Sequence, residues 1–181
     1  MKSGEVDAVV EKRRILLFPV QEDPNSERVF RWYVEAFRRP VDELIILTIV
    51  EPCLQIGEIH EDELVGASDP LLEVAMMAGR RVVRRFMRWA RELNLSCRGL
   101  VQLDTSPGPS IVRTAKERGV DAILMGSRGC SQRSEKQNVG NVAEYVLRNC
   151  PNISIAIVPG AGIGRRQRSD SLYKQFMENL F

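Results

Sequence analysis

Histidine is nearly absent from this sequence, and cysteine is sparse. The single histidine, His60, excludes most histidine-based catalytic triads and metal sites that need two histidines. The four cysteines lie far apart and form no C-x-x-C pair; they are Cys53, Cys97, Cys130 and Cys150. We therefore expect reduced thiols in a reducing compartment rather than a disulfide scaffold.

Long apolar runs and an excess of one charge are also missing. No run approaches the roughly 20 apolar residues that a membrane helix needs, and residues 1–11 lack the apolar core of a secretory signal. Lys and Arg number 26 and Asp and Glu 24, so a net charge of +2 supplies no overall field for a nucleic acid or an acidic membrane. We expect a cytoplasmic protein with no nucleic-acid partner and no membrane partner.

Five short segments, most of them rich in apolar residues, predict strands. The segments cover residues 14–20, 43–50, 95–103, 121–126 and 153–158. Apolar residues at helical spacing predict helices from an N-cap at Ser26 to Phe37, over about two dozen residues from Pro70, over residues 110–118 with Gly119 as cap, and over residues 140–149. This alternation predicts an α/β fold: a doubly wound five-stranded parallel sheet, Rossmann-like, with helices on both faces.

The chain divides into three parts by composition. Residues 1–12 form an N-terminal extension, and residues 13–159 hold the strands and helices of one α/β domain. Residues 160–181 combine a linker rich in glycine and arginine with a predicted amphipathic helix. This helix packs on its own domain or docks onto a second subunit or partner, and the sequence leaves both possibilities open.

Glycines follow the fourth predicted strand, at the edge where an open parallel sheet binds its ligands. The strand runs into MGSRG at residues 125–129, and after a polar stretch Gly140 and Asn141 begin the next helix. Backbone amides approach phosphate oxygens closely where no Cβ intervenes, and a helix start adds unpaired donors. Arg128 makes the loop basic. The pattern predicts an anion site, although a tight strand exit and a helix cap explain the same glycines.

These residues, with SIVRTAKERGVDAIL before them and VAEYVLRNCPNISIAIVP after them, resemble the universal stress protein family over residues 13–159. The resemblance implies the doubly wound fold, a homodimer and, in one branch, ATP binding marked by G-x2-G-x9-G-[S/T]. Gly126 and Gly129 match the first two glycines, and Gly140 matches the third. Two departures weaken the match: ten residues separate Gly129 from Gly140, and Asn141 replaces the serine or threonine.

The resemblance also implies a nucleoside site at the end of the first strand. Relatives carry an aspartate there; its place falls on Gln21 counted back from Ser26, or on Val20 counted forward from the strand. Its loss weakens binding by about 1–3 kcal/mol, or roughly 5- to 150-fold. In the family the backbone after the second strand, here up to Val50, borders the adenine. The residues expected to bind the nucleotide are Val20, Gln21, Val50, Met125, Gly126, Arg128, Gly129, Gly140 and Asn141.

We expect a universal stress protein-like module that binds ATP, AMP or ADP, with Mg²⁺ accompanying the nucleotide, and acts in stress response or signalling. The resemblance implies a homodimer through the apolar edge strand at residues 153–158. One alternative is a dimeric scaffold or signalling module of the same fold that binds no nucleotide. Another is a slow ATPase, for which the sequence offers only weak candidates for a general base: His60, Glu22 and Asp23.

Overall fold

A parallel β-sheet forms the centre of the fold. The computed structural model describes residues 13–52, 70–127 and 140–160, and its strands are all parallel, in the order β3-β2-β1-β4-β5. The strands are β1 (Arg14–Pro19), β2 (Asp42–Val50), β3 (Ser96–Leu103), β4 (Ala122–Gly126) and β5 (Ser154–Val158). The helices are α1 (Pro24–Trp32), α2 (Pro70–Glu92), α3 (Pro107–Arg118) and α4 (Asn141–Asn149), and a π-helix, η1 (Tyr33–Phe37), continues α1. The predicted fold is confirmed.

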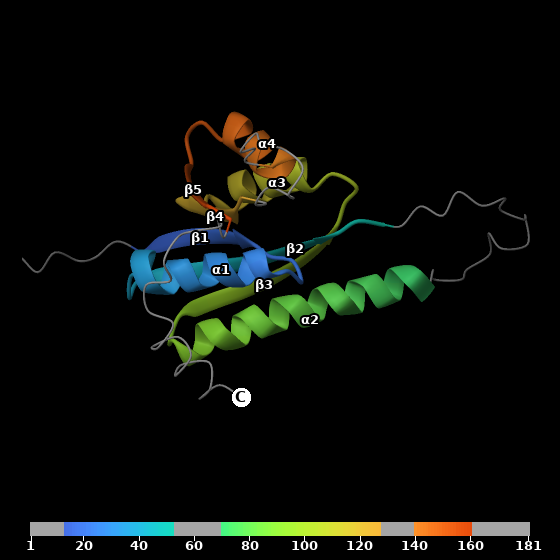
Figure 1. The fold of residues 1–181 in the computed structure, drawn as a ribbon, viewed down its shortest axis with the longest axis horizontal. Helices are drawn as coiled ribbons and strands as arrows, with labels where there is room; N and C mark the ends of the chain where they lie inside the picture. The colour runs from blue at the N-terminus through green and yellow to red at the C-terminus, as the bar shows by residue number, and fades with distance from the viewer. Residues whose placement is uncertain (1–12, 53–69, 128–139, 161–181) are drawn as a thin grey trace, which may run out of the picture.

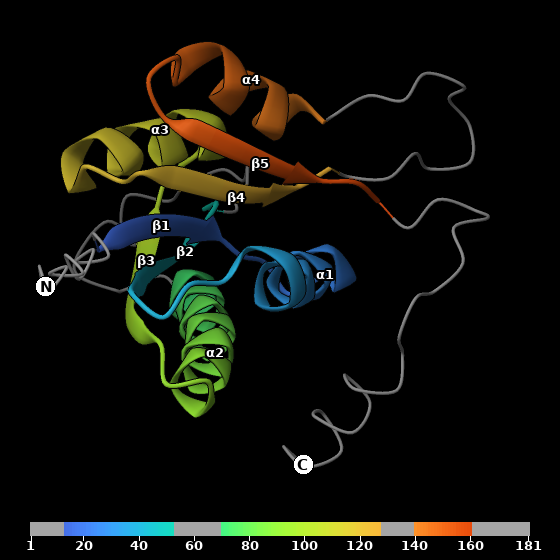
Figure 2. The same ribbon diagram turned by 90° about the vertical axis from the view of Figure 1, so that its left-hand side faces the viewer.

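Helices cover both faces of the sheet (Figure 1). α1 and α2 lie on one face, and α3 and α4 lie on the other, as Figure 2 shows. From β1 the chain moves outward to β2 and β3, and it then returns to the other side of β1 to build β4 and β5. β1 and β4 therefore flank the switch point of the topology, where sheets of this kind bind ligands beyond the carboxyl ends of their strands.

The two faces of the sheet bury different kinds of side chain. Facing α1 and α2, the rings of Phe18, Phe30, Phe86 and Trp89 pack with centroids 4.9 to 6.0 Å apart. Aromatic pairs at this spacing contribute about 0.5–1.5 kcal/mol each beyond their burial. The core facing α3 and α4 is aliphatic. The rings hold α1 against β1 and so position the turn that joins them.

The start of α1 differs from the sequence prediction. The helix begins at Pro24 rather than after Ser26, because Asp23 is its N-cap and accepts a hydrogen bond from the Ser26 amide at 2.7 Å. The Ser26 hydroxyl oxygen instead accepts a hydrogen bond from the Gln21 amide at 2.9 Å. Both bonds fix the turn between β1 and α1.

The end of this helical segment also differs. Regular α-helix stops at Trp32, and the five residues of η1 form a wider turn in which the Arg38 amide donates to the Tyr33 carbonyl at 2.8 Å. The apolar spacing predicted a continuous helix to Phe37, because that spacing does not separate an α-helix from a single π turn.

The third helix begins earlier than predicted and ends where predicted. α3 starts at Pro107 rather than at Ser110, because proline suits the first turn, where its missing N–H would have no helical partner. Gly119 ends α3 in the left-handed conformation, with φ 58° and ψ 47°. The predicted glycine cap is confirmed.

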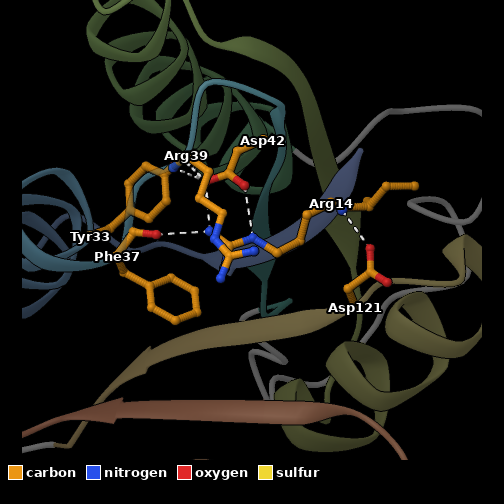
Figure 3. Close-up of polar contacts among 7 residues, drawn as sticks. Arg14, Tyr33, Phe37, Arg39, Asp42 and Asp121 are labelled. Atoms are coloured by element: carbon orange, nitrogen blue, oxygen red, sulfur yellow. Dashed lines mark hydrogen bonds and ion pairs between the residues drawn. The ribbon is translucent and has the colours of Figure 1, made fainter. Parts of the chain in front are cut away.

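A network of charged and polar side chains closes the amino-terminal edge of β1 and β2 (Figure 3). Arg14 donates two hydrogen bonds to the Asp42 carboxylate, at 2.8 and 2.9 Å, and another to the Phe37 carbonyl at 2.8 Å. The buried Tyr33 hydroxyl and the Arg39 amide donate to the same carboxylate at 2.9 and 2.8 Å. The network ties η1 to β1 and β2.

The groups of this network hold one another in a fixed protonation state. Burial disfavours the charged form of Asp42, but hydrogen bonds from Arg14, the Arg39 amide and Tyr33 outweigh it and lower the pKa of the carboxyl. Burial, reinforced by the hydrogen bond to Asp42, raises the pKa of Tyr33 well above its usual range. The hydrogen bond to Asp42 also raises the pKa of Arg14. At neutral pH the network therefore consists of a cation, an anion and a neutral phenol.

Several residues that the sequence analysis singled out lie outside the described part of the chain. They are His60, Cys130, Arg128, Gly129 and the predicted C-terminal helix within residues 161–181. Within the described part, no helix is long and apolar enough to cross a membrane. The predictions that concern residues outside the described part of the chain stay predictions.

Candidate functional site

A cavity of about 300 Å³ opens at the carboxyl-terminal edge of the sheet. Its wall comes from the turn after β1, the carboxyl ends of β2 and β4, and the first turns of α1, α3 and α4. The cavity therefore lies at the switch point of the topology. Its volume is at the lower end of the range for sites that enclose small organic ligands.

Six of the nine residues that the sequence analysis expected to bind a ligand line this cavity. They are Val20, Gln21, Met125, Gly126, Gly140 and Asn141. They belong to three segments that are far apart in the sequence, and the parallel topology brings these segments to one edge. Arg128 and Gly129 are outside the described residues.

Val50, the remaining expected residue, is not part of the cavity wall. Side chains alternate between the two faces of a strand, and Val50 faces α2, where its Cγ2 lies 2.8 Å from the position of a Cβ built on Gly79. Its carbonyl accepts a hydrogen bond from the Asp104 amide at 3.1 Å. Leu47 and Ile49, on the other face of β2, line the cavity instead.

The start of α4 forms part of the cavity wall. Gly140 is the N-cap, in a conformation that side chains disfavour (φ 95°, ψ 141°), and among the described residues no side chain caps the helix. The first helical hydrogen bond runs from the Glu144 amide to the Gly140 carbonyl at 2.9 Å. The amides of Asn141, Val142 and Ala143 precede that bond, and all three residues line the cavity. This end of the helix favours an anion.

The other two helix starts around the cavity offer fewer donors. Asp23 caps α1 with its carboxylate. In α3, Pro107 and Pro109 have no N–H to donate, and the Ser110 amide donates to the Ser106 carbonyl at 3.2 Å. Of the three helix starts, α4 is therefore the one best arranged to receive a negative charge.

The end of β4 serves the sheet and its packing. The Ser127 amide donates to the Val158 carbonyl, and the Gly160 amide donates to the Ser127 hydroxyl oxygen, each at 2.9 Å. A Cβ on Gly126 would lie only 3.2 Å from Val29 Cγ2, so the missing side chain lets α1 pack closely against β4. This end of β4 has the features of a tight strand exit, whereas the start of α4 has those of an anion site.

Apolar side chains form another part of the wall. They are Val20, Val29, Leu47, Ile49, Ile111 and Met125. A wall of this kind suits a flat apolar group such as a purine ring. Leu47, Ile49 and Ile111 were not among the predicted residues, because the family motif marks strand ends and helix starts. The alternation along β2 and the apolar face of α3 carried the signal.

Polar side chains from the start of α1 complete the wall. Asp23, Asn25 and Ser26 all line the cavity. From the sequence, Asp23 was only a weak candidate for a general base, and the place of the family's nucleoside-binding aspartate fell on Gln21 or Val20. The structure shows that a carboxylate nevertheless lies at this end of the cavity, where the helix cap holds it.

These features define a doubly wound α/β protein with a ligand-sized cavity at the switch point of a parallel sheet. The chain belongs to the universal stress protein family, whose family model matches residues 12–159. No curated protein matches the chain significantly.

Solved structures of universal stress proteins share this fold. A family member from Arabidopsis thaliana with AMP bound has a TM-score of 0.57 and 13% identity, over 82% of this chain and 93% of its own. A universal stress protein in complex with cAMP has a TM-score of 0.54 and 21% identity, over 80% and 96%. UspA from Lactobacillus plantarum has a TM-score of 0.56 and 18% identity, over 81% and 99%. At these identities the likeness shows the fold.

Proposed function

We propose that this protein binds an adenine nucleotide, ATP in the first place, in the cavity at the carboxyl-terminal edge of the sheet. One observation carries the proposal: an apolar wall and the start of α4, which no described side chain caps, meet in a single cavity. A nucleotide has an apolar ring system at one end and a negative charge at the other, so it matches both. The AMP and cAMP complexes of structurally similar family members support the choice of adenine.

In this proposal the base lies against Leu47, Ile49 and Ile111, and the phosphates lie at the amides of Asn141 and its neighbours. Arg128 and Gly129 contribute as the family resemblance implies. Among the described residues, no group of three His, Cys, Asp or Glu side chains could hold a metal ion. Mg²⁺ would therefore enter with the nucleotide, on its phosphate oxygens. AMP and ADP would bind the same site.

Binding itself tests the proposal. The purified native chain is titrated calorimetrically with ATP, AMP, GTP and adenosine, with and without Mg²⁺, after mass spectrometry has checked it for retained nucleotide. We expect ATP to bind, and GTP to bind more weakly. Absence of any binding at millimolar ATP would overturn the proposal.

Asn141→Asp locates the phosphates. The change keeps the size of the side chain but adds a negative charge at the first position of α4, where the phosphates would lie. We expect it to lower the affinity for ATP at least about tenfold, since like charges repel at short range, and to leave the affinity for adenosine unchanged. Asn149→Asp adds the same charge at the far end of the same helix and is the matched control. Equal affinities of both variants for ATP would contradict the phosphate assignment.

We further propose that the protein forms a homodimer through β5 and acts by binding, in stress response or signalling in the cytoplasm. In the described part of the chain β5 ends the sheet. The Ser154 amide and the Val158 carbonyl bond toward β4, at 3.3 and 2.9 Å. Because backbone groups alternate along a strand, those of Ile155 and Ile157 point to the open edge, where a second copy can add its own strand.

Ile157→Pro tests whether the dimer forms through β5. Proline removes an outward N–H and leaves the hydrogen bonds to β4 in place. We expect light scattering to report a dimer for the native chain and for Ile157→Val, and a monomer for Ile157→Pro. A native monomer, or a proline variant that dimerises like the valine variant, would refute the assignment.

The alternative function is a dimeric scaffold that binds no nucleotide. The observation that favours it is the engagement of the Ser127 amide with Val158, together with the replacement of the family's serine or threonine by Asn141. A dimeric native chain that binds none of the four ligands would establish it.

A further inference from the structure

One arginine beside the cavity lies in an unusual environment. Arg28, on α1, donates from Nη1 to the Asn25 side-chain oxygen at 2.8 Å and from Nη2 to the Ser127 carbonyl at 3.4 Å. Its Nε is buried and has no hydrogen-bond partner among the described residues. The second of its two bonds is long. The guanidinium thus donates only to neutral oxygens, and not all of its N–H groups have an acceptor among the described residues.

Several other arginines of the fold form ion pairs with carboxylates. Arg14 pairs with Asp42, Arg98 with Glu43, Arg81 with Glu22, Arg85 with Glu27, Arg113 with Asp104 and Arg148 with Glu144. Within the described part of the chain, Arg28 makes no such ion pair. Burial lowers the pKa of Arg28, and the charge of Asp23 offsets this only in part. A partly buried cation without an anion lowers the stability of the fold. A role in binding would explain why such a residue is present.

The position of Arg28 relates it to the cavity. Asn25 and Val29, its neighbours on α1, line the cavity, as does Gly126. The Nη2 atom lies 3.7 Å from the position of a Cβ built on Gly126, which places the guanidinium in van der Waals distance of this part of the cavity wall. α1 and α4 lie on opposite faces of the sheet (Figure 2). An anion between the two helix starts would meet backbone amides of α4 on one side and Arg28 on the other.

We propose that Arg28 is a phosphate-binding residue of the nucleotide site, acting from the α1 side of the cavity. The inference rests on the proposed function and adds a residue to it. When the nucleotide binds, the guanidinium gives up its long contact with the Ser127 carbonyl and turns Nη2 to a phosphate oxygen. The planar fork of donors on arginine matches a phosphate better than it matches a single carbonyl.

The experiment compares ligands with and without phosphate. ATP, AMP and adenosine are titrated into the native chain, Arg28→Gln, Arg28→Lys and Arg31→Gln. Arg31→Gln removes the same charge from the same helix, one turn further along, and is the matched control. For Arg28→Gln we expect the affinity for ATP to fall about 10- to 100-fold, the loss that removal of a hydrogen-bonded charge produces. The affinity for adenosine should change less than about twofold.

Arg28→Lys should retain part of the ATP affinity, because lysine keeps the charge and loses the fork. Arg31→Gln should bind ATP like the native chain. Far-ultraviolet circular dichroism of each variant checks the fold, and Arg28→Lys carries the test if Arg28→Gln does not fold.

The inference is overturned if Arg28→Gln binds ATP like the native chain, or if it loses ATP and adenosine equally, which would mean that Arg28 acts through the fold. A native chain that binds neither ligand refutes the proposed function itself, so the two failures are distinguishable.

Discussion

The two edges of the sheet treat charge in opposite ways. At the amino-terminal edge, Arg14, Asp42 and Tyr33 satisfy one another in a closed network (Figure 3). At the carboxyl-terminal edge, the first amides of α4 and the guanidinium of Arg28 lack strong partners within the described residues. The first edge holds the fold together, and the second is where we propose that a ligand binds.

The parallel topology explains this difference. Every crossover helix starts near the carboxyl-terminal edge of the sheet and ends near the amino-terminal edge, so orphan amides gather at one edge and orphan carbonyls at the other. The carbonyls are captured by side chains of the protein: Arg14 donates to the Phe37 carbonyl, and Arg38 to the Leu93 carbonyl, each at 2.8 Å. For the first amides of α4, the described residues show no such side-chain cap.

The largest expected effect comes from breaking the amino-terminal network. Asp42→Ala leaves Arg14, which is only 14% exposed, without its anion. Loss of one partner from a buried pair costs about 3–5 kcal/mol. We expect urea unfolding at pH 7 to show a loss of this size. Asp104→Ala breaks the exposed pair with Arg113 at the other edge and should change the stability far less. Similar losses for both variants would erase the difference between the edges.

Lowering the pH should reduce the free energy of unfolding by a smaller amount. Because the fold lowers the pKa of Asp42, its contribution to stability is complete above the unfolded-state pKa of about 3.9 and is lost as the pH falls through the lower folded-state pKa. We expect the free energy of unfolding to decline with acid over that window. Asp42→Asn should be less stable at pH 7 and should show a shallower decline. If the stability of Asp42→Asn declines as steeply with acid as that of the native chain, groups other than Asp42 cause the pH dependence.

The smallest effect on stability belongs to the carboxyl-terminal edge. Asn141→Asp puts a negative charge at the start of α4, which favours the helix by about 0.3–1 kcal/mol. We expect thermal unfolding without ligand to show an unchanged or slightly higher Tm, while the affinity for ATP falls. A clear loss of stability would mean that Asn141 serves the fold rather than the site.

The sequence alone predicted the fold well and the cavity in part. Short segments rich in apolar residues identified the strands, and the glycine after α3 identified its cap, because both signals are local. Gln21, Gly126 and Gly140 were predicted from the family motif, and the topology brings them to one edge.

What the sequence could not provide depends on long-range geometry. The pair between Arg14 and Asp42 joins residues 28 positions apart and has no local signature. The turn of Val50 away from the cavity requires the face of each β2 residue to be known. That Arg28 forms no ion pair within the described residues becomes visible only in the folded structure.

The two prolines at the start of α3 have a consequence for how a guest is oriented. Pro107 and Pro109 remove backbone donors from one side of the cavity, next to the apolar contact that Ile111 offers. A ligand with one apolar end and one anionic end would therefore bind in one orientation. The reversed orientation would place its negative charge against the start of α3, which offers few hydrogen-bond donors. Replacing both prolines with residues that have a backbone N–H should weaken this preference and allow the ligand to bind in more than one orientation.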